Sequence, residues 1–306
     1  MNAYKATFII SSIVFYCSAF EPTLIRDWKM HAQPVLRNFR TTAMFFPRLK
    51  NLDLHGLRTL RASGSGQFSA RQLKDLKKIL PAPLHVVDLR EESHGFINGL
   101  PVSWHTKHNS INWGKSLCQV QVDELQRLKN ILEQKTVHLY VNAKQDERSG
   151  NVKYEPYKTV TVLTSLTEEE ICQRNGVGYT RIPVADSQAP DATDVQQFIN
   201  LVRRSPRTTW FHFHCRAGRG RTTTFMVLYD MMRNADTVSL PNILARQHAL
   251  DGVDLNYITD ASFWKYKHLI KRKAFVTLFY KYCQEQKPVN FIAPWALWLK
   301  NQAVKK

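Results

Sequence analysis

The stretch from Trp210 to Leu228 constrains the fold of this chain more than any other part of the sequence. An apolar run, Trp210-Phe211-His212-Phe213, leads into the octapeptide His214-Cys215-Arg216-Ala217-Gly218-Arg219-Gly220-Arg221, and a second apolar run, Thr224 to Leu228, follows. This order predicts a buried strand, a glycine-rich loop and a helix, as in α/β folds. The unpaired N–H groups and the dipole of a helix N-terminus favour a bound anion. We therefore expect an anion site at this loop.

The loop places a thiol inside the expected anion site. The thiolate is the nucleophilic form of cysteine, and helix N-termini and nearby cations stabilise it. Cys215 would have both, because Arg221 closes the loop and Thr222 can donate a hydroxyl hydrogen bond to the sulfur. The planar fork of Arg221 matches two phosphate oxygens. We expect Cys215 to attack phosphorus; the alternatives are a plain connecting loop or a phosphate-binding relic without turnover.

The remaining loop residues have separate expected tasks. Gly218 and Gly220 are expected to allow the backbone angles that let successive N–H groups converge on one anion. His214 is expected to hold the loop backbone rather than to exchange protons. The phosphate-binding set predicted around the nucleophile consists of His214, Arg216, Ala217, Gly218, Arg219, Gly220 and Thr222.

Expulsion of an alkoxide also needs a general acid. The best candidate is Asp186, which follows an expected strand at 179–182 and precedes an expected helix that begins near Asp191. An acid on such a loop can approach a bound phosphate. The alternative is that Asp186 is a turn residue, because aspartate also suits turns and helix caps.

With these residues in place, the chain resembles the protein-tyrosine-phosphatase-like phytases, bacterial cysteine phosphatases that act on inositol polyphosphates. The resemblance covers most of the chain after residue 35 and includes Asp186 and the whole loop. Further matching segments are Ala62–Ser69, Val87–Gly95, Pro101–Trp104, Ile243–His248, Trp264–Lys267, Phe279–Tyr282 and Pro294-Trp295.

The resemblance implies a mechanism, a fold and further site residues. Cys215 would form a phosphocysteine, and Asp186 would protonate the leaving oxygen and then serve as base for the hydrolytic water. No metal or cofactor is implied. The implied fold is a phosphatase-like sheet flanked by helices, with a small β-rich subdomain at about 95–165. Arg40, Lys144 and Lys265 are implied to bind substrate.

Several positions depart from the family pattern. Ala189 stands where relatives carry an aromatic residue, Asn109 stands where they carry an aspartate, and Gln145 and Asp146 follow Lys144 where they can place histidine or lysine. The resemblance therefore implies hydrolysis of inositol hexakisphosphate and lower inositol phosphates but leaves the preferred substrate open. Phosphoinositides and phosphotyrosine are alternative substrates, and a catalytically silent phosphate-binding module is a further alternative.

Composition agrees with a polyanionic partner. The formal net charge is +18 over 306 residues, which favours anionic ligands. Nucleic acid is not expected, because the sequence has no strong nucleic-acid motif and the phosphate loop accounts for the charge. The oligomeric state does not follow from the sequence.

The N-terminus predicts export. Residues 1–19 combine Lys5, an apolar run from Ala6 to Tyr16 and small residues at Cys17-Ser18-Ala19, which is typical of a signal peptide. An N-terminal core element is the alternative. The run is too short for a membrane span, so no stable membrane anchor is expected. Residues 20–306 would form the phosphatase domain, exported to the periplasm or medium, or delivered to a host cell.

Patterns along the chain predict alternating helices and strands. We expect helices at 69–80, at 122–134 through Leu125, Leu128 and Leu132, and after Thr167. We expect strands at 85–89, 137–141 and 159–163. Helices rich in Phe and Tyr near the C-terminus are expected to cover an α/β sheet.

Overall fold

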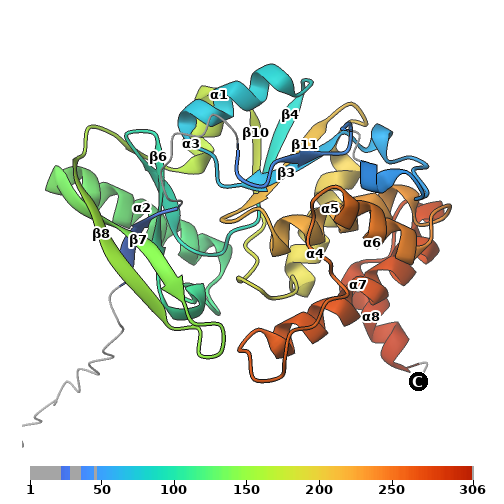
Figure 1. Ribbon diagram of the computed structural model, residues 1–306. Coiled ribbons are helices and arrows are strands. Elements are labelled where there is room, and N and C mark those ends of the chain that lie inside the picture. Colours follow the sequence, from blue (N-terminus) through green and yellow to red (C-terminus); the bar gives the residue numbers. More distant parts are fainter. Residues whose placement is uncertain (1–21, 28–35, 45–46, 305–306) are drawn as a thin grey trace, which may run out of the picture.

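The computed structural model describes residues 22–27, 36–44 and 47–304, so the expected signal peptide at residues 1–19 lies outside the described residues. Two sheets organise this part of the chain, and helices flank the first of them on both faces (Figure 1). The predicted mixed α/β fold is confirmed. None of the described helices is both long and apolar enough to cross a membrane.

The first sheet carries the loop at its centre. Its strand order is β10 (Gly178–Arg181), β4 (Leu84–Asp88), β11 (Trp210–Cys215), β3 (Ala62–Gly66) and β2 (Arg40–Thr41). The first four strands are parallel and β2 is antiparallel to β3. The carboxyl ends of parallel strands meet at one edge, where ligands bind in such folds. Cys215 ends β11 and therefore lies at that edge.

Helices cover both faces of this sheet. α1 (Ala70–Ile79) and α3 (Glu168–Arg174) lie on one face, where Leu73 and Ile171 join a core with Val86. The other face carries α4 (Ala192–Arg204), α5 (Gly220–Asn234), α6 (Leu240–Ala249), α7 (Tyr266–Gln286) and α8 (Trp295–Val304). Phe198, Phe225 and Phe279 belong to the core on that second face, as expected for the aromatic C-terminal helices.

The second sheet stands beside the first (Figure 1). Its order is β8 (Val152–Thr161), β7 (Thr136–Gln145), β1 (Thr23–Arg26), β6 (Leu100–His105), β5 (His94–Ile97) and β9 (Ser165–Leu166). α2 (Leu117–Gln134) packs on it through Leu128 and Ile131. The predicted β-rich region at about 95–165 supplies every strand of this sheet except β1. That strand comes from a segment for which no strand was predicted.

Capping residues set the helix boundaries. Ser69, Thr167 and Asp191 each cap a helix through a capping box with the residue three positions on, which satisfies N–H groups that have no partner inside the helix. Ser116 caps α2 in the same way, so this helix begins five residues before the expected start at Val122.

The expected apolar face of α2 is wrong. Its buried residues are Val120, Glu124, Leu128 and Ile131, whereas Leu125 and Leu132 are 54% and 44% exposed. The spacing of the leucines indicated a helix correctly. It indicated the wrong face because one buried position on the true face is a charged residue, Glu124.

Glu124 joins α2 to the first sheet. Arg181, at the end of β10, donates through Nη1 to both carboxylate oxygens of Glu124 at 3.0 and 2.9 Å. The same guanidinium donates to the backbone oxygens of Arg90 and Glu92 at 2.9 and 3.0 Å. Arg181 and Glu124 are both buried, so a charged contact in the interior holds the two sheets at a fixed relative position.

We predict that Glu124→Ala lowers the free energy of unfolding by about 3–5 kcal/mol, because it leaves the Arg181 guanidinium buried without its carboxylate. Glu133→Ala on the same helix is the control, since Glu133 is exposed and lies 3.9 Å from Lys129; its effect should stay within about 0.5 kcal/mol. Urea unfolding measures both. Equal losses of unfolding free energy in the two variants would show that Glu124 does not connect α2 to the first sheet.

Candidate active site

The carbonyl groups of the loop between β11 and α5 point away from the pocket. The oxygen of Arg216 accepts from the backbone N–H of Gln67 at 3.2 Å, and the oxygen of Ala217 accepts from Asn38 Nδ2 at 2.7 Å. The oxygen of Gly218 accepts from Arg40 Nη1 at 2.7 Å. Because C=O and N–H of a trans peptide point in opposite directions, the N–H groups of residues 217, 218 and 219 turn toward the pocket.

A close backbone contact makes this loop shape possible. Gly218 has a φ of +72°, and a Cβ there would lie 2.3 Å from the backbone N of Gly66. A side chain at 218 would therefore push the loop off β3. Gly220 differs from the expectation, because its φ lies outside the left-handed region. A Cβ there would lie 2.9 Å from Arg272 Nη1, the far end of a flexible side chain that can shift at little cost.

Arg40 is not where the resemblance placed it. Its side chain is fully buried and does not line the pocket. It donates to the Gly218 oxygen at 2.7 Å and to Thr223 Oγ1 at 3.0 Å. Burial lowers the pKa of Arg40 to about 10, so the guanidinium is still charged at neutral pH. Arg40 supports the loop from behind rather than from the substrate side.

The Cys215 sulfur lies at the base of the pocket. The residue is 4% exposed, and Thr222 Oγ1 donates to its Sγ at 3.2 Å. Thr222 is in the first turn of α5, whose N-terminus points at the loop. The expected hydroxyl contact to sulfur is therefore present.

Arg221 is held by one buried carboxylate. Its Nη1 and Nη2 donate to the two oxygens of Glu92 at 2.6 and 3.0 Å. Nη1 also donates to the backbone oxygens of Leu89 and Val184 at 3.3 and 3.1 Å. Burial alone would lower the pKa of Arg221, but Glu92 outweighs burial and raises it well above its usual value. The guanidinium is thus permanently charged and fixed in orientation.

Asp186 faces the same pocket from the loop after β10. Its Oδ1 lies 3.4 Å from Arg221 Nη2, and its side chain is 40% exposed. A tight turn holds it, in which Gln188 N donates to the Ala185 oxygen at 3.1 Å and Ser187 takes a φ of +65°. The candidate acid and the candidate nucleophile therefore open into one cavity, as the sequence predicted.

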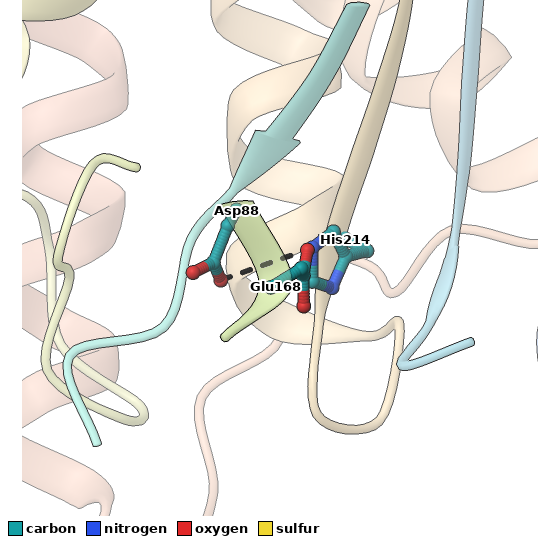
Figure 2. A group of neighbouring side chains, drawn as sticks. All are labelled: Asp88, Glu168 and His214. Atoms are coloured by element: carbon teal, nitrogen blue, oxygen red, sulfur yellow. Dashed lines mark hydrogen bonds and ion pairs between the residues drawn. The ribbon is translucent and has the colours of Figure 1, made fainter. Parts of the chain in front are cut away.

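His214 lies on the opposite side of β11 from Cys215. Successive residues of a strand point to opposite faces, so His214 faces α3 while Cys215 faces α5. Figure 2 shows His214 beside Glu168 and Asp88, and its Nε2 is 2.6 Å from Glu168 Oε1. Burial opposes ionisation of Glu168, but His214 lowers its pKa to about 2. His214 is therefore a support for the strand end, not a phosphate ligand.

The trio Asp88, Glu168 and His214 has the residue types of a metal site, but its oxygens already have partners. Asp88 Oδ2 accepts from Tyr179 at 3.0 Å and lies 3.3 Å from His94 Nε2. Burial disfavours the charged form of His94, yet Asp88 and Glu124 raise its pKa to about 10. An imidazolium thus balances the carboxylates where a cation would otherwise be needed.

The pocket is a strongly cationic cavity of about 890 Å³. Among the residues predicted from the sequence, Cys215, Asp186 and Lys265 line it together with loop residues 216, 217, 219, 220 and 221. Seven arginine or lysine side chains and three aspartates line this cavity. Such an excess of positive charge favours a ligand with several negative groups.

Lys144 and Asn109 do not line the cavity. Lys144 is exposed on β7, whereas its neighbour Gln145 lines the cavity. The alternation of side chains along a strand explains the difference. Asn109 is buried outside the cavity lining.

Sequence reasoning missed Arg272, Arg37 and Glu92. Lys265, Leu269 and Arg272 all line the cavity, and their spacing of four and then three residues places them on one helix face. That spacing could have identified Arg272 once Lys265 was chosen. Arg37 and Glu92 carry no comparable local signal.

Comparison with known proteins agrees with this geometry. The PTP-like phytase family model, described as inositol hexakisphosphate, matches residues 87–233. A PTP-like phytase from Bdellovibrio bacteriovorus is 34% identical, with 90% of this chain and 94% of that chain covered and a TM-score of 0.70. The chain belongs to the PTP-like phytase family. Membership of this family supports the fold described above. The roles of individual residues rest on the geometry of the site.

Two further relatives are longer than this PTP-like phytase chain. The tandemly repeated PTP-like phytase from Mitsuokella multacida matches at 34% identity and a TM-score of 0.81, covering 92% of this chain and 49% of that one. A structure of the M. multacida PTP-like myo-inositol phosphatase, in complex with myo-inositol-(1,3,4,5)-tetrakisphosphate, matches with a TM-score of 0.80.

Effector protein hopD2 of Pseudomonas syringae pv. tomato is 27% identical over 268 residues, which is 85% of this chain and 56% of hopD2. The chain thus spans about half the length of these longer relatives.

We predict that Thr222→Val slows alkylation of Cys215 by iodoacetamide at pH 6 by about tenfold to a hundredfold, because a hydrogen bond to a charged group contributes about 1.5–3 kcal/mol. The matched control is Thr224→Val, since Thr224 is also buried in α5 but donates only to the Gly220 oxygen at 2.9 Å. Alkylation followed by mass spectrometry gives both rates. If the two variants react alike, the hydroxyl does not stabilise the thiolate.

Proposed function

We propose that this chain is a cysteine-dependent phosphatase that hydrolyses inositol hexakisphosphate and lower inositol phosphates. One observation carries the proposal: Cys215, Arg221 and Asp186 open into a single cavity of about 890 Å³ whose charged lining side chains are mainly cationic. A nucleophile, a guanidinium fork and an acid around one cavity supply what transfer of a phosphoryl group requires.

In the first step the Cys215 thiolate attacks phosphorus. An S–P bond forms, the bond from phosphorus to the ester oxygen breaks, and Asp186 gives its proton to the leaving oxygen. Arg221 and the inward N–H groups of residues 217–219 bind the equatorial oxygens, on which negative charge is spread. The products are the alcohol and a phosphocysteine.

In the second step water completes the cycle. The Asp186 carboxylate takes a proton from the water, the water oxygen bonds to phosphorus, and the S–P bond breaks. Inorganic phosphate leaves and the thiolate is restored. Arg221 acts in both steps because Glu92 keeps it charged and oriented.

The excess of cations around the cavity supports a polyphosphorylated substrate. Lys265 lies at the start of α7, with Nζ 5.2 Å from the centre of the Trp264 ring, and Arg272 lies two turns further along the same face. The M. multacida phosphatase that matches this chain was solved with an inositol tetrakisphosphate, which supports the same substrate class here.

We also propose action in a host cell, and the support is the relative named as effector protein hopD2. The alternative route, export through a signal peptide at residues 1–19, stays a prediction. In either case the substrate would be met outside the producing cell.

Phosphate release from inositol hexakisphosphate tests the proposal. We expect wild type to release phosphate from it faster than from a phosphoinositide or a phosphotyrosine peptide, since only the first presents phosphates on all sides to the cavity cations. Cys215→Ser should release no phosphate, because the serine hydroxyl is not ionised near neutral pH. This variant should still bind the substrate. Binding without turnover by the wild type would instead support the silent-module alternative.

We predict that Asp186→Asn lowers kcat on inositol hexakisphosphate by roughly 10²–10⁴ and affects p-nitrophenyl phosphate much less, because a good leaving group needs no proton. Asp254→Asn is the control, since Asp254 also lines the cavity but accepts a hydrogen bond from its own turn at Asn256. Steady-state rates on both substrates decide the point. Equal losses on the two substrates would show that another group is the acid.

A further inference from the structure

Arg216 follows the nucleophile directly, and its guanidinium is anchored on one side only. Its Nε lies 3.2 Å from Asp27 Oδ1, while its side chain lines the cavity and is 18% exposed. Within the described residues, no hydrogen bond engages its two terminal nitrogens. An arginine held by Nε presents the other two nitrogens as a fork, the geometry that suits two oxygens of one phosphate.

Asp27 is itself rigidly held. It follows β1 in the second sheet and is 2% exposed. Its Oδ2 accepts from Arg90 Nη1 at 2.8 Å, and its Oδ1 accepts from Ser103 Oγ. Oδ2 is thus used for Arg90, and Oδ1 is shared among Ser103, Arg216 and, at 3.5 Å, Arg90 Nη2. The carboxylate has no freedom to follow Arg216, so it fixes where the Arg216 fork lies.

The anchor is part of a buried chain of hydrogen bonds that returns to the other side of the nucleophile. Arg90 Nη1 also donates to Gln67 Oε1 at 2.6 Å, and Gln67 Nε2 donates to Glu168 Oε2 at 2.7 Å. Glu168 holds His214 at 2.6 Å. The two residues that flank Cys215 are therefore connected through buried side chains, and Asp27 is the last member before Arg216.

Arg219 shows what an unanchored arginine of the same loop looks like. It also lines the cavity but is exposed, and within the described residues no carboxylate lies within ion-pair distance of it. Its charge attracts anions through solvent, where such contacts contribute little. Of these two loop arginines, Arg216 is the one that offers a fixed fork beside the scissile phosphate.

We propose that Asp27 is a positioning residue that makes Arg216 the binding group for a second phosphate next to the scissile one. Asp27 thereby sets the selectivity of the site for polyphosphates over monophosphates. The inference rests on the proposed function only insofar as Cys215 marks the phosphate site. A monophosphate is taken by Arg221 and the loop N–H groups and leaves Arg216 without an oxygen to bind.

A purely neutralising role for Asp27 predicts the opposite change in polyphosphate binding. If Asp27 only neutralised Arg216, removing its charge would make the cavity more cationic and would tighten polyphosphate binding. If Asp27 positions Arg216, Asp27→Asn loosens the fork and weakens polyphosphate binding despite the gain in positive charge. The sign of the change separates the two roles.

The experiment measures binding in a Cys215→Ser background, by calorimetry at one fixed salt concentration. The ligands are inositol hexakisphosphate and phenyl phosphate, which carries one phosphate. Arg216→Ala should weaken hexakisphosphate binding by about tenfold to a hundredfold and phenyl phosphate binding by less than about threefold. Asp27→Asn should also lower the preference for hexakisphosphate over phenyl phosphate. The double variant Asp27→Asn with Arg216→Ala should bind both ligands as Arg216→Ala alone does.

Two controls complete the test. Asp27→Asn combined with Arg219→Ala should show independent, multiplying effects, because Asp27 does not contact Arg219. Arg216→Lys leaves Asp27 and Arg90 intact but cannot bind Asp27 and offer a fork at once, so it should lose nearly as much selectivity as Arg216→Ala. This variant decides the question if Asp27→Asn fails to fold, which thermal unfolding shows.

Tighter hexakisphosphate binding by Asp27→Asn, full selectivity in Arg216→Lys, or equal losses on both ligands would overturn the proposal. So would a parent protein that binds the two ligands equally well. The proposed function fails on a different result, the absence of phosphate release by the protein with Cys215 intact. Binding selectivity is measured without turnover, so the two failures are distinguishable.

Discussion

The buried carboxylate of Glu92 is the contact on which the geometry of the site depends. It binds both terminal nitrogens of Arg221 and also accepts from Arg90 Nε at 3.0 Å. Desolvation largely offsets the attraction within such a pair, so its main effect is on orientation rather than on stability. Glu92 lies between β4 of the first sheet and β5 of the second. The Arg221 guanidinium is therefore oriented only when both sheets are in place.

The same dependence on distant segments holds for the loop backbone. The donors that turn the loop carbonyls outward are Asn38, Arg40 and the N–H of Gln67, all more than a hundred residues earlier in the chain. Because these donors belong to the chain itself, the inward direction of the loop N–H groups is set by the fold. Dipoles fixed in advance are the ones that stabilise a transition state most effectively.

The contrast between Cys215 and Arg40 shows how far the sequence could lead. The nucleophile, Arg221 and the strand–loop–helix order follow from one contiguous segment, in which each residue type has a local reason. Asp186 needed the resemblance as well, because an aspartate after a strand has several ordinary explanations. Arg40 was assigned to the substrate side but lies behind the loop. His214 was placed in the phosphate-binding set and was also expected to hold the loop backbone, and it has only the supporting position.

The position of Arg40 could not be predicted from the sequence, for a physical reason, whereas that of His214 could. The face on which a side chain lies depends on strand register, and Arg40 is on a two-residue strand, too short for any periodic signal. His214 had a usable signal, the alternation along β11 that separates it from Cys215. Glu92 and Asp27 act through contacts between two sheets, and no local pattern reports such pairing.

The arginines of the loop that line the cavity are of two kinds, and they differ in what they can contribute. Arg216 and Arg221 each have a buried carboxylate partner, so their orientation is fixed before a ligand arrives. Arg219 is exposed and acts mainly through its charge. Arg272 belongs to neither kind: it is 5% exposed, its Nε has no hydrogen-bond partner within the described residues, and burial lowers its pKa.

Burial of the Arg272 guanidinium is costly unless a partner compensates it. Asp186 offsets part of the effect of burial on its pKa, and the side chain lines the cavity beside the first turn of α5. A phosphate placed there would supply the missing acceptor and recover the cost of burial on binding. Arg272 is thus a further cation through which the cavity would favour a substrate with more phosphates than the reacting one.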